Sequence, residues 1–436
     1  MILTGSSSLA NRADWRNTLI NSLFTRVNVI ARFNESPLHF YLSDLAQKLN
    51  RQGYSRGVIR RHLCAGEKFG RWLTANKLTP SDANESLVKR YVAEQWPNSA
   101  GCGRQKMKAH AGLMHLVCIL RESRAILDAS VDLTASPAHT WLYGFEKYLV
   151  QVAGATESTC KRYVPIARRF IEQTFGDGTL QWRILTADHV TAFVTREAAT
   201  KSGFGRKAAP VAIRAVIRFL VSSGDIRVGL DAAIPTMRSW QHAALPRHIS
   251  DDLLDRVLAD CRDSKPHNHR NLAIVLLLAR LGIRANEIVQ IQMEDIDWRN
   301  ARISIRPGKN HTERVLPLSQ EIGDALSQYL SKARPHSDSR RVFLSHRPPF
   351  HPLAGSSAIS VMAKRALLGN GFKQSRLVGS HNFRHTVAST MVSNGATFKD
   401  VADVLGHQSI ETTGIYAKLD LKSLAAVALP WEGGAR

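Results

Sequence analysis

Apolar residues recur at helical spacing through most of this chain. The first long stripe lies between about residues 35 and 126, and its spacings of two to four predict one face of an amphipathic helix. Its members are Phe40, Leu42, Leu45, Ala46 and Leu49. Gly53 follows the stripe and is expected to end the helix. Residues 1–34 have only scattered apolar positions, so they predict an N-terminal arm with a short helix.

The apolar pattern of this region repeats about one hundred residues later. Gly53 and Phe69 correspond to Gly154 and Phe170 at an offset of 101. At an offset of 102, Val88, Tyr91 and Val92 correspond to Val190, Phe193 and Val194. At an offset of 100, Leu113, Leu116, Val117 and Leu120 correspond to Ile213, Val216, Ile217 and Leu220. Two amphipathic segments can be aligned by chance, but a near-constant offset favours an internal duplication. We therefore predict successive helical domains at 35–130 and 135–235.

A third domain is expected at 245–436, after a proline-containing linker. Ser250 precedes Asp251 and Asp252, which is typical of a helix N-terminus with a serine cap. Residues 271–281 predict a buried helix that ends at Gly282.

A β-hairpin is predicted within this third domain. Residues 303–305 alternate as a strand, residues 307–311 have turn composition, and residues 314–318 return, with Lys309 at the tip. The expected fold is therefore mainly α with a small β-sheet or hairpin in the last domain, an α+β arrangement.

The charge of the chain points to a polyanionic partner. Lys and Arg number 59 against 36 Asp and Glu, a net charge of +23 with a sequence pI of about 10.2. Such a field attracts phosphate backbones, which favours double-stranded DNA over a membrane. The most apolar run, 272–279, has eight residues, whereas a membrane span needs about 20. The N-terminus lacks the pattern of a secretion signal, so we expect a cytoplasmic, nucleoid-associated protein.

The five cysteines do not suggest a metal site. Their number is odd, they are scattered, and no Cys-x-x-Cys pair or histidine partner occurs at ligand spacing. We expect reduced packing residues, no structural zinc and no cofactor. The cysteines are Cys64, Cys102, Cys118, Cys160 and Cys261.

Basic residues gather in the second helical domain around a glycine-rich turn at 202–205. A single one is more often a solvated helix residue than a ligand contact, but the group fits phosphate binding, which sets affinity without reading sequence. The predicted DNA-binding residues are Lys161, Arg162, Arg168, Arg169, Lys201, Arg206, Lys207 and Arg214, with Arg218 beside them.

Candidate chemistry lies in the third domain. Arg284 falls between two predicted helices, where its guanidinium suits either two phosphate oxygens or an ion pair with Glu287 one turn later. His381 and Arg384 lie at the start of a helix whose apolar positions Phe383, Val387 and Met391 are expected to face the core.

The last part of the chain adds a tyrosine to these residues. His407 follows a helix predicted to end at Gly406, and Ser409 is placed to cap a helix that carries Tyr416. Tyr416 is 35 residues after His381 (416 − 381), and a tyrosine among cationic side chains is a candidate nucleophile.

These segments resemble the tyrosine recombinase (phage integrase) family. The resemblance rests on Leu-Gly-Ile-Arg-Ala-Asn-Glu at 281–287, Pro-Gly-Lys at 307–309, His-Asn-Phe-Arg-His-Thr at 381–386 and the run from Leu405 to Tyr416. It covers the whole third domain, and residues 135–235 resemble the family's helical, SAM-like core-binding domain. The helical domain at 35–130 departs from the smaller family members.

The resemblance implies cleavage and rejoining of DNA through a 3′-phosphotyrosine, without metal or ATP. It implies that Arg284 and Arg384 hold the phosphate and that Lys309 acts from the hairpin. His381 and His407 would be the two histidines, and Tyr416 the nucleophile.

The resemblance also implies a tetrameric synapse, of this chain alone or with related recombinases, coupled by an apolar tail after Tyr416. The size and the duplication favour an integrase or transposase. The alternatives are topoisomerase IB-like relaxation of DNA and a non-catalytic DNA-binding accessory protein.

Overall fold

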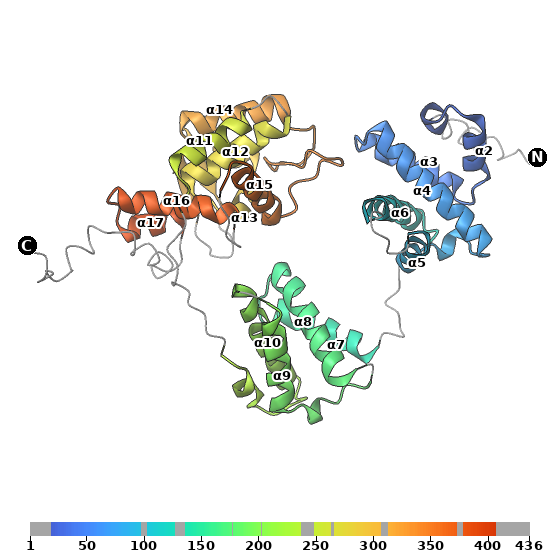
Figure 1. Cartoon of the computed structure of the whole chain (residues 1–436), viewed down its shortest axis with the longest axis horizontal. Helices are drawn as coiled ribbons and strands as arrows, with labels where there is room; N and C mark the ends of the chain where they lie inside the picture. Colours follow the sequence, from blue (N-terminus) through green and yellow to red (C-terminus); the bar gives the residue numbers. More distant parts are fainter. Residues whose placement is uncertain are drawn as a thin grey trace, which may run out of the picture. The chain divides into compact units, whose positions relative to one another are not determined.

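The structure is a computed structural model that describes residues 19–96, 103–126, 136–176, 178–201, 203–236, 248–262, 266–306, 313–372 and 378–406 (Figure 1). The chain divides into two compact units. One contains residues 1–126 together with 244–436, and the other contains residues 127–243. The helices before residue 127 and the elements after residue 247 have separate hydrophobic cores, so each is described by itself.

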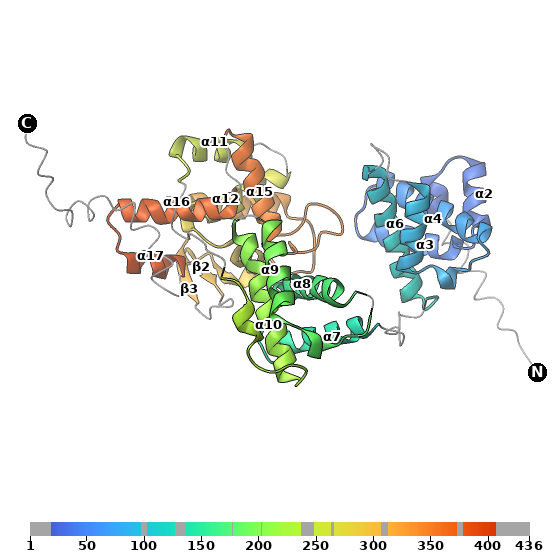
Figure 2. The ribbon, with the colours of Figure 1, turned by 60° about the horizontal axis from the view of Figure 1, so that its bottom comes forward.

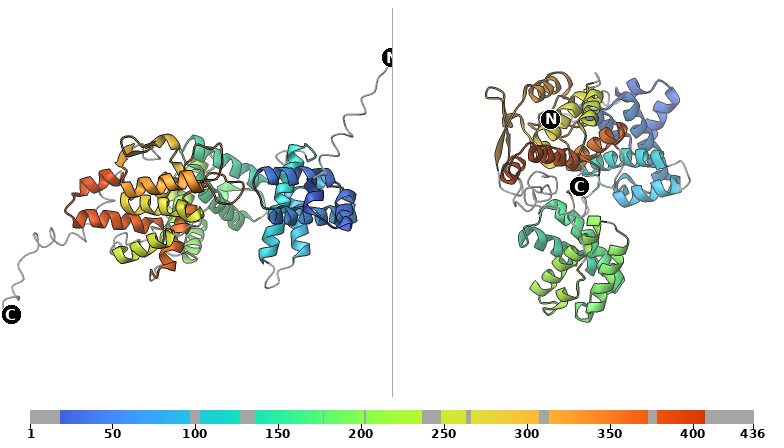
Figure 3. Two further views of the ribbon diagram at one scale, coloured as in Figure 1. Left: turned by 90° about the horizontal axis from the view of Figure 1, so that it is seen from above. Right: turned by 60° about the vertical axis from the view of Figure 1, so that its left-hand side comes forward.

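The first helical part packs its helices around one core, and Figure 3 shows it from two further directions. Its elements are α2 (Val27–Glu35), α3 (His39–Arg51), α4 (Arg56–Ala75), the 3₁₀ turn η1 (Pro80–Asp82), α5 (Glu85–Gln95) and α6 (Gly103–Glu122). The core begins at Ile20 and includes Phe24 and Phe33, before the predicted boundary at residue 35. The apolar positions of the arm are therefore packing residues.

The stripe on α3 matches the prediction at four of its five positions. Leu42, Leu45, Ala46 and Leu49 are fully buried, but Phe40 is 53% exposed. Placing Phe40 in the core was wrong, because it lies only two residues before Leu42, about 200° around the helix from it.

The second unit repeats the order of α3, α4, η1, α5 and α6 and has two further 3₁₀ turns, η3 and η4. Its elements are α7 (Pro137–Gln151), α8 (Glu157–Phe175), η2 (Trp182–Ile184), α9 (Ala187–Ala199), η3 (Gly203–Lys207), α10 (Ala208–Ser222) and η4 (Leu230–Ala233). The side chain of Ser136 caps α7 by accepting a hydrogen bond from the backbone N–H of His139.

The two helical bundles agree with an internal duplication. Helices α4 and α8 begin 101 residues apart, α5 and α9 begin 102 apart, and α6 and α10 end 100 apart. Every apolar pair that the sequence aligned is buried in both bundles. Gly53 and Gly154 both have positive φ, 80° and 59°, at the turn that leads into the long helix. The same residue pattern therefore builds the same local structure twice.

The last part surrounds a buried central helix, α12. Its helices are α11 (Asp251–Cys261), α12 (Pro266–Leu281), α13 (Ala285–Gln290), α14 (Gln320–Gln328), α15 (Ser356–Gly369), α16 (Ser380–Ser393) and α17 (Phe398–Leu405), with the 3₁₀ turn η5 (Met293–Asp295) and the π turn η6 (Tyr329–Ala333). Residues 273–278 of α12 are all buried, as the sequence predicts. Phe383 is buried, whereas Val387 and Met391 pack partly buried against a second small cluster.

A three-stranded antiparallel sheet accompanies these helices (Figure 2). It consists of β1 (Ile296–Asp297), β2 (Arg302–Ile305) and β3 (Arg314–Pro317). The pairing of Ile305 with Arg314 confirms the predicted hairpin. Strand β1 was not predicted, because two residues carry no alternation.

Two smaller expectations have different outcomes. Ser250 is at the N-cap of α11, but its side chain makes no capping hydrogen bond, so that part of the prediction was wrong. Cys64, Cys118, Cys160 and Cys261 are free thiols, while Cys102 lies outside the described residues.

Neither a metal-binding cluster nor a membrane-spanning helix occurs among the described residues. None of the groups formed by His, Cys, Asp and Glu there is arranged to hold a metal ion. In the same part of the chain, no helix has the length and apolar character needed to cross a membrane.

Candidate active site

Arg284 lies where α12 gives way to α13, and its side chain has two partners. Its Nη1 donates to Oε1 of Glu287 at 2.9 Å, and its Nη2 donates to the carbonyl oxygen of Gly406 at 2.7 Å. The side chain remains 28% exposed. The predicted ion pair with Glu287 is therefore present, and the side chain is still partly accessible.

Glu287 is shared between two arginines. Its carboxylate also accepts hydrogen bonds from Nη2 of Arg314 at 2.6 Å and from the backbone N–H of Arg284 at 3.0 Å. Burial alone would raise the pKa of Glu287, but the hydrogen bonds and charge of Arg314, together with the hydrogen bonds from Arg284, lower it below its ordinary value. Glu287 is thus an ionised anchor that orients both guanidinium groups.

Arg384 lies on α16 and is only 6% exposed. Its Nη1 donates to the carbonyl oxygen of Gly282 at 2.7 Å, and its Nη2 donates to that of Leu405 at 2.6 Å. Arg384 and Arg284 therefore bind consecutive carbonyl oxygens, those of residues 405 and 406. Two cationic groups that are 100 residues apart in sequence converge at the C-terminal end of α17.

Two glycines make this convergence possible. Gly282 has φ of 60°, and a Cβ there would lie 2.6 Å from Cδ2 of Leu405. Gly406 has φ of 63°, and a Cβ there would collide with the guanidinium of Arg314 and lie 3.6 Å from Nη1 of Arg284. Both positions combine a left-handed backbone with close packing, so any larger residue would move an arginine or the end of α17.

His381 begins the same helix as Arg384. More than a third of its surface is accessible, yet partial desolvation of the ring and then the charges of Arg384 and Arg284 lower its pKa. The pKa of His385, one turn later, is lowered by desolvation and by the charges of His381 and Arg384. The geometry and these shifts favour a neutral imidazole at His381, which can accept a proton.

Three of the six predicted active-site residues lie outside the described residues. They are Lys309, His407 and Tyr416. Lys309 is in the segment that joins β2 to β3. The base of that hairpin is tied to α13, because Arg314 is the first residue of β3 and pairs with Glu287. Of the other three, the structure brings Arg284 and Arg384 together beside His381.

Arg314 and the shared role of Glu287 were missed by sequence reasoning. Arg314 was assigned only to the returning strand of the hairpin, and Glu287 only to Arg284. Nothing in the local pattern distinguishes Arg314 from a solvated strand residue, yet its side chain is only 10% exposed. Its partner is 27 residues away in sequence, so only the tertiary fold reveals the pair.

The basic residues predicted to bind DNA in the second unit have different surroundings. Arg169 forms a two-pronged ion pair with Glu197, with distances of 3.0 and 2.8 Å, so its guanidinium is held by the fold. Lys161 pairs with Glu157 on the exposed surface, and Nε of Arg206 donates to the carbonyl oxygen of Lys201. Arg162 and Arg168 are exposed, whereas Lys207 and Arg214 are half-buried. For all of these residues, DNA contact stays a prediction.

Comparisons with known proteins show the family of the chain. Residues 247–422 match the model of the phage integrase family. The chain is 34% identical over 408 residues to y4rA of Sinorhizobium fredii, covering 93% of this chain and 98% of that protein, whose given name places it in the integrase/recombinase class. Tyrosine recombinase XerD of Lacticaseibacillus casei is 29% identical over 243 residues, 55% of this chain and 80% of that protein.

A solved structure supports the same fold. The chain resembles the XerH site-specific recombinase, determined as a post-cleavage complex with a palindromic difH substrate, with a TM-score of 0.51 and 18% sequence identity. The match covers 66% of this chain and 84% of that one.

Proposed function

The chain belongs to the phage integrase family and is a tyrosine site-specific recombinase, an enzyme that cleaves and rejoins DNA, and we propose that Tyr416 is its nucleophile. The observation that supports this most directly is the convergence of Arg284 and Arg384 on the carbonyls of residues 405 and 406, eleven and ten residues before Tyr416. Two arginines there provide a cationic site for one phosphate.

The proposed cleavage step forms one bond and breaks one. The Tyr416 hydroxyl oxygen attacks phosphorus, a P–O bond to tyrosine forms, and the bond from phosphorus to the 5′ oxygen breaks. His381 accepts the tyrosine proton, and Lys309 gives a proton to the departing 5′ oxygen. Rejoining is the same step in reverse, with a 5′-hydroxyl from the partner duplex as the nucleophile.

The two arginines contribute most where negative charge develops. Attack on a phosphodiester concentrates charge on the non-bridging oxygens, and fixed guanidinium groups stabilise that state more than the ground state. Glu287 holds Arg284 in place, and backbone carbonyls hold Arg384, so neither group has to reorganise during the reaction. We assign His407 to the same phosphate.

Strand exchange needs two duplexes, so we propose a tetramer assembled on double-stranded DNA at the bacterial nucleoid. The apolar positions after Tyr416, from Leu419 to Leu429, have a helical spacing and suit docking on a neighbouring subunit. Truncation after Lys418 is then expected to lower cooperative assembly on DNA while monomer binding persists.

The test of the nucleophile uses a nicked suicide substrate, which traps covalent protein–DNA adducts. Wild-type protein is expected to form the adduct, and Tyr416→Phe is expected to bind the same DNA without forming it. Arg384→Lys, which keeps the charge but loses the forked geometry, is expected to cleave more slowly. An adduct formed by Tyr416→Phe would refute the assignment.

A further inference from the structure

The first helical part carries a groove whose charged lining is entirely basic. The groove has a volume of about 480 Å³ and lies between α4 and α6, which pack side by side (Figure 2). Its cations are Arg60, Arg61 and Lys68 from α4 and Lys108 from α6. All four side chains are exposed, and among the described residues no carboxylate lines the walls.

The floor of the groove is apolar and fixed. Phe24, only 4% exposed, and the half-buried Trp96 line it together with Cys64. The guanidinium carbon of Arg60 lies 5.2 Å from the centre of the Phe24 ring, which holds this cation at the rim. The groove therefore presents fixed positive charge along its rim, which attracts phosphate groups.

The two copies of the duplicated bundle differ in whether these basic residues have acidic partners. Arg60 and Arg61 correspond to Lys161 and Arg162, and Lys68 corresponds to Arg169, all at an offset of 101. The second copy neutralises two of these cations, since Lys161 pairs with Glu157 and Arg169 pairs with Glu197.

The first copy lacks both acids. The positions that correspond to Glu157 and Glu197, at the offsets of 101 and 102 of their helices, are Arg56 and Gln95. No ion pair among the described residues involves Arg61, Lys68 or Lys108. The same scaffold thus carries basic residues with their partners in one copy and without them in the other.

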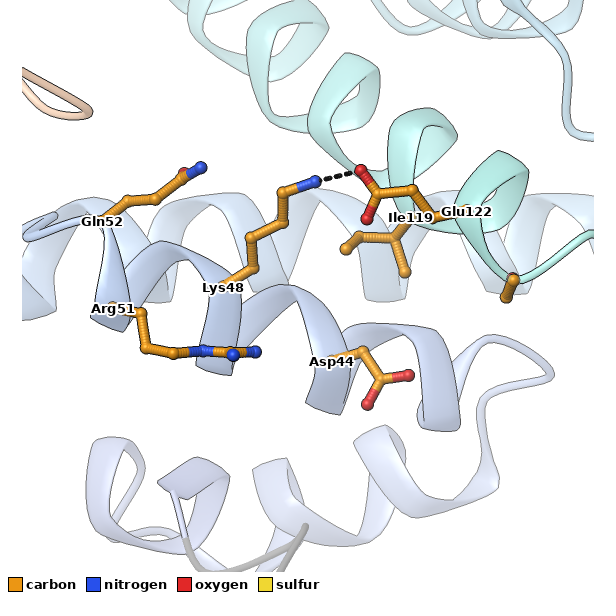
Figure 4. Close-up of a pocket in the computed structure, with 7 residues that line it drawn as sticks. Asp44, Lys48, Arg51, Gln52, Ile119 and Glu122 are labelled. Carbon is orange, nitrogen blue, oxygen red and sulfur yellow. Dashed lines mark hydrogen bonds and ion pairs between the residues drawn. The ribbon is translucent and has the colours of Figure 1, made fainter. Parts of the chain in front are cut away.

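A second cavity of this part serves as a contrast. It lies between α3 and α6, and Figure 4 shows its lining. Lys48 points toward Glu122 and pairs with it at 2.5 Å, and Asp44 lies on the same wall. Its charges are mixed and partly paired, so it has no preference for a polyanion.

We propose that the groove of Arg60, Arg61, Lys68 and Lys108 binds the sugar–phosphate backbone of double-stranded DNA. The chain would then contact DNA outside the site where strands are cut. The proposal rests on DNA being the substrate of the chain. The lining has four cations and one side-chain amide, Gln105, so we expect it to add affinity and length of contact through phosphates and not to read sequence. Each phosphate neutralised releases counterions, which steepens the salt dependence of binding by about 0.9 in a double-logarithmic plot.

The experiment measures binding of the full-length chain to a long duplex by fluorescence anisotropy across a salt series. The groove variant is Arg61→Ala with Lys108→Ala, one cation from each wall, and it leaves Arg60 on Phe24. The control is Arg51→Ala with Lys89→Ala, which removes two exposed cations elsewhere in the same bundle. Circular dichroism checks that both variants keep the helical content of the wild type.

The groove variant is expected to lower the slope by about 1.8, twice the contribution of one phosphate. It should also shorten the stretch of DNA protected from hydroxyl radicals, while the control keeps the wild-type slope. An unchanged slope, or equal changes in both variants, would overturn the proposal. A larger loss of affinity for single-stranded RNA than for duplex would assign the groove to RNA and overturn it as well.

Failure of the proposed cleavage chemistry is separable from these outcomes. The groove residues lie outside the cleavage site, so the variant is expected to form the covalent adduct on a saturated suicide substrate as the wild type does. If no form of the chain cleaves, the nucleophile assignment fails, and the salt slopes still decide whether the groove holds DNA.

Discussion

Removing the carboxylate of Glu287 is expected to destabilise the last part of the chain and to slow cleavage. In Glu287→Ala, Arg314 loses its carboxylate partner while only 10% exposed, and Arg284 loses one of its two hydrogen-bond partners. Removing one member of a buried pair costs about 3–5 kcal/mol, because a desolvated charge is left behind. For a domain of this size, that lowers the midpoint of unfolding by roughly 6–20 °C.

Scanning calorimetry of the full-length protein measures this shift. Glu287→Gln keeps the shape and one acceptor oxygen, so an intermediate decrease is expected. Glu294→Ala is the matched control, since it removes an ion pair with Arg340 in which both side chains are about half or more exposed, and it should leave the transition in place. The adduct assay should show slower cleavage by Glu287→Ala at a temperature where that variant is still folded.

The pH dependence gives a second check on the same residue. The pKa of Glu287 is lowered in the folded state, so its contribution to stability is present above its ordinary value of 4.5 and is lost as the pH falls through the lower folded value. The wild type and Glu287→Ala should therefore differ at neutral pH and converge in acid. A destabilisation of about 1 kcal/mol would lower the unfolding midpoint by at least about 2 °C. If the midpoint of Glu287→Ala at pH 7 lies within about 2 °C of the wild-type midpoint, the reasoning is refuted.

Three further substitutions test other features. Gly406→Ala places a Cβ against Arg314 and should slow adduct formation by up to about 10²-fold, whereas Gly395→Ala, with φ of 88° and open space around it, should affect only stability. His62 is 8% exposed and its pKa is lowered to about 4 from 6.5, so lowering the pH from 7 to 4 should cost the first bundle about 3 kcal/mol in urea unfolding, and His62→Gln should flatten that loss. Arg169→Ala should cost about 1 kcal/mol in the same assay through loss of the ion pair with Glu197. Weaker DNA binding by this variant would support its predicted DNA contact, and unchanged affinity would refute it.

The local pattern of the sequence was enough to predict the helices, the hairpin and the duplication. Apolar stripes such as 42–49 and turn glycines such as Gly53 act within one or two turns of helix, so the linear order carries the information. The same is true of Gly406, which ends α17 with φ of 63° as expected. The two-residue strand β1 lacks any such signal.

Contacts between distant residues could not be predicted in this way. Arg314 reaches Glu287 across 27 residues, and Arg169 reaches Glu197 across 28. An arginine on a predicted strand or helix has the same sequence signature whether it faces solvent, DNA or a buried carboxylate. The family motifs identified Arg284 and Arg384, whereas Arg314 lies outside those motifs.

The hydrogen bonds to the carbonyls of residues 405 and 406 also constrain the length of α17 during evolution. Each residue added to or removed from α17 would turn the end of the helix by about 100°, and the carbonyls that Arg384 and Arg284 bind would face elsewhere. Insertions and deletions between Phe398 and Leu405 should therefore be absent among active relatives, even where substitutions are frequent. The eight-residue length of α17 thus acts as a spacer of fixed length, and we expect an alignment of active relatives to show it as an ungapped block.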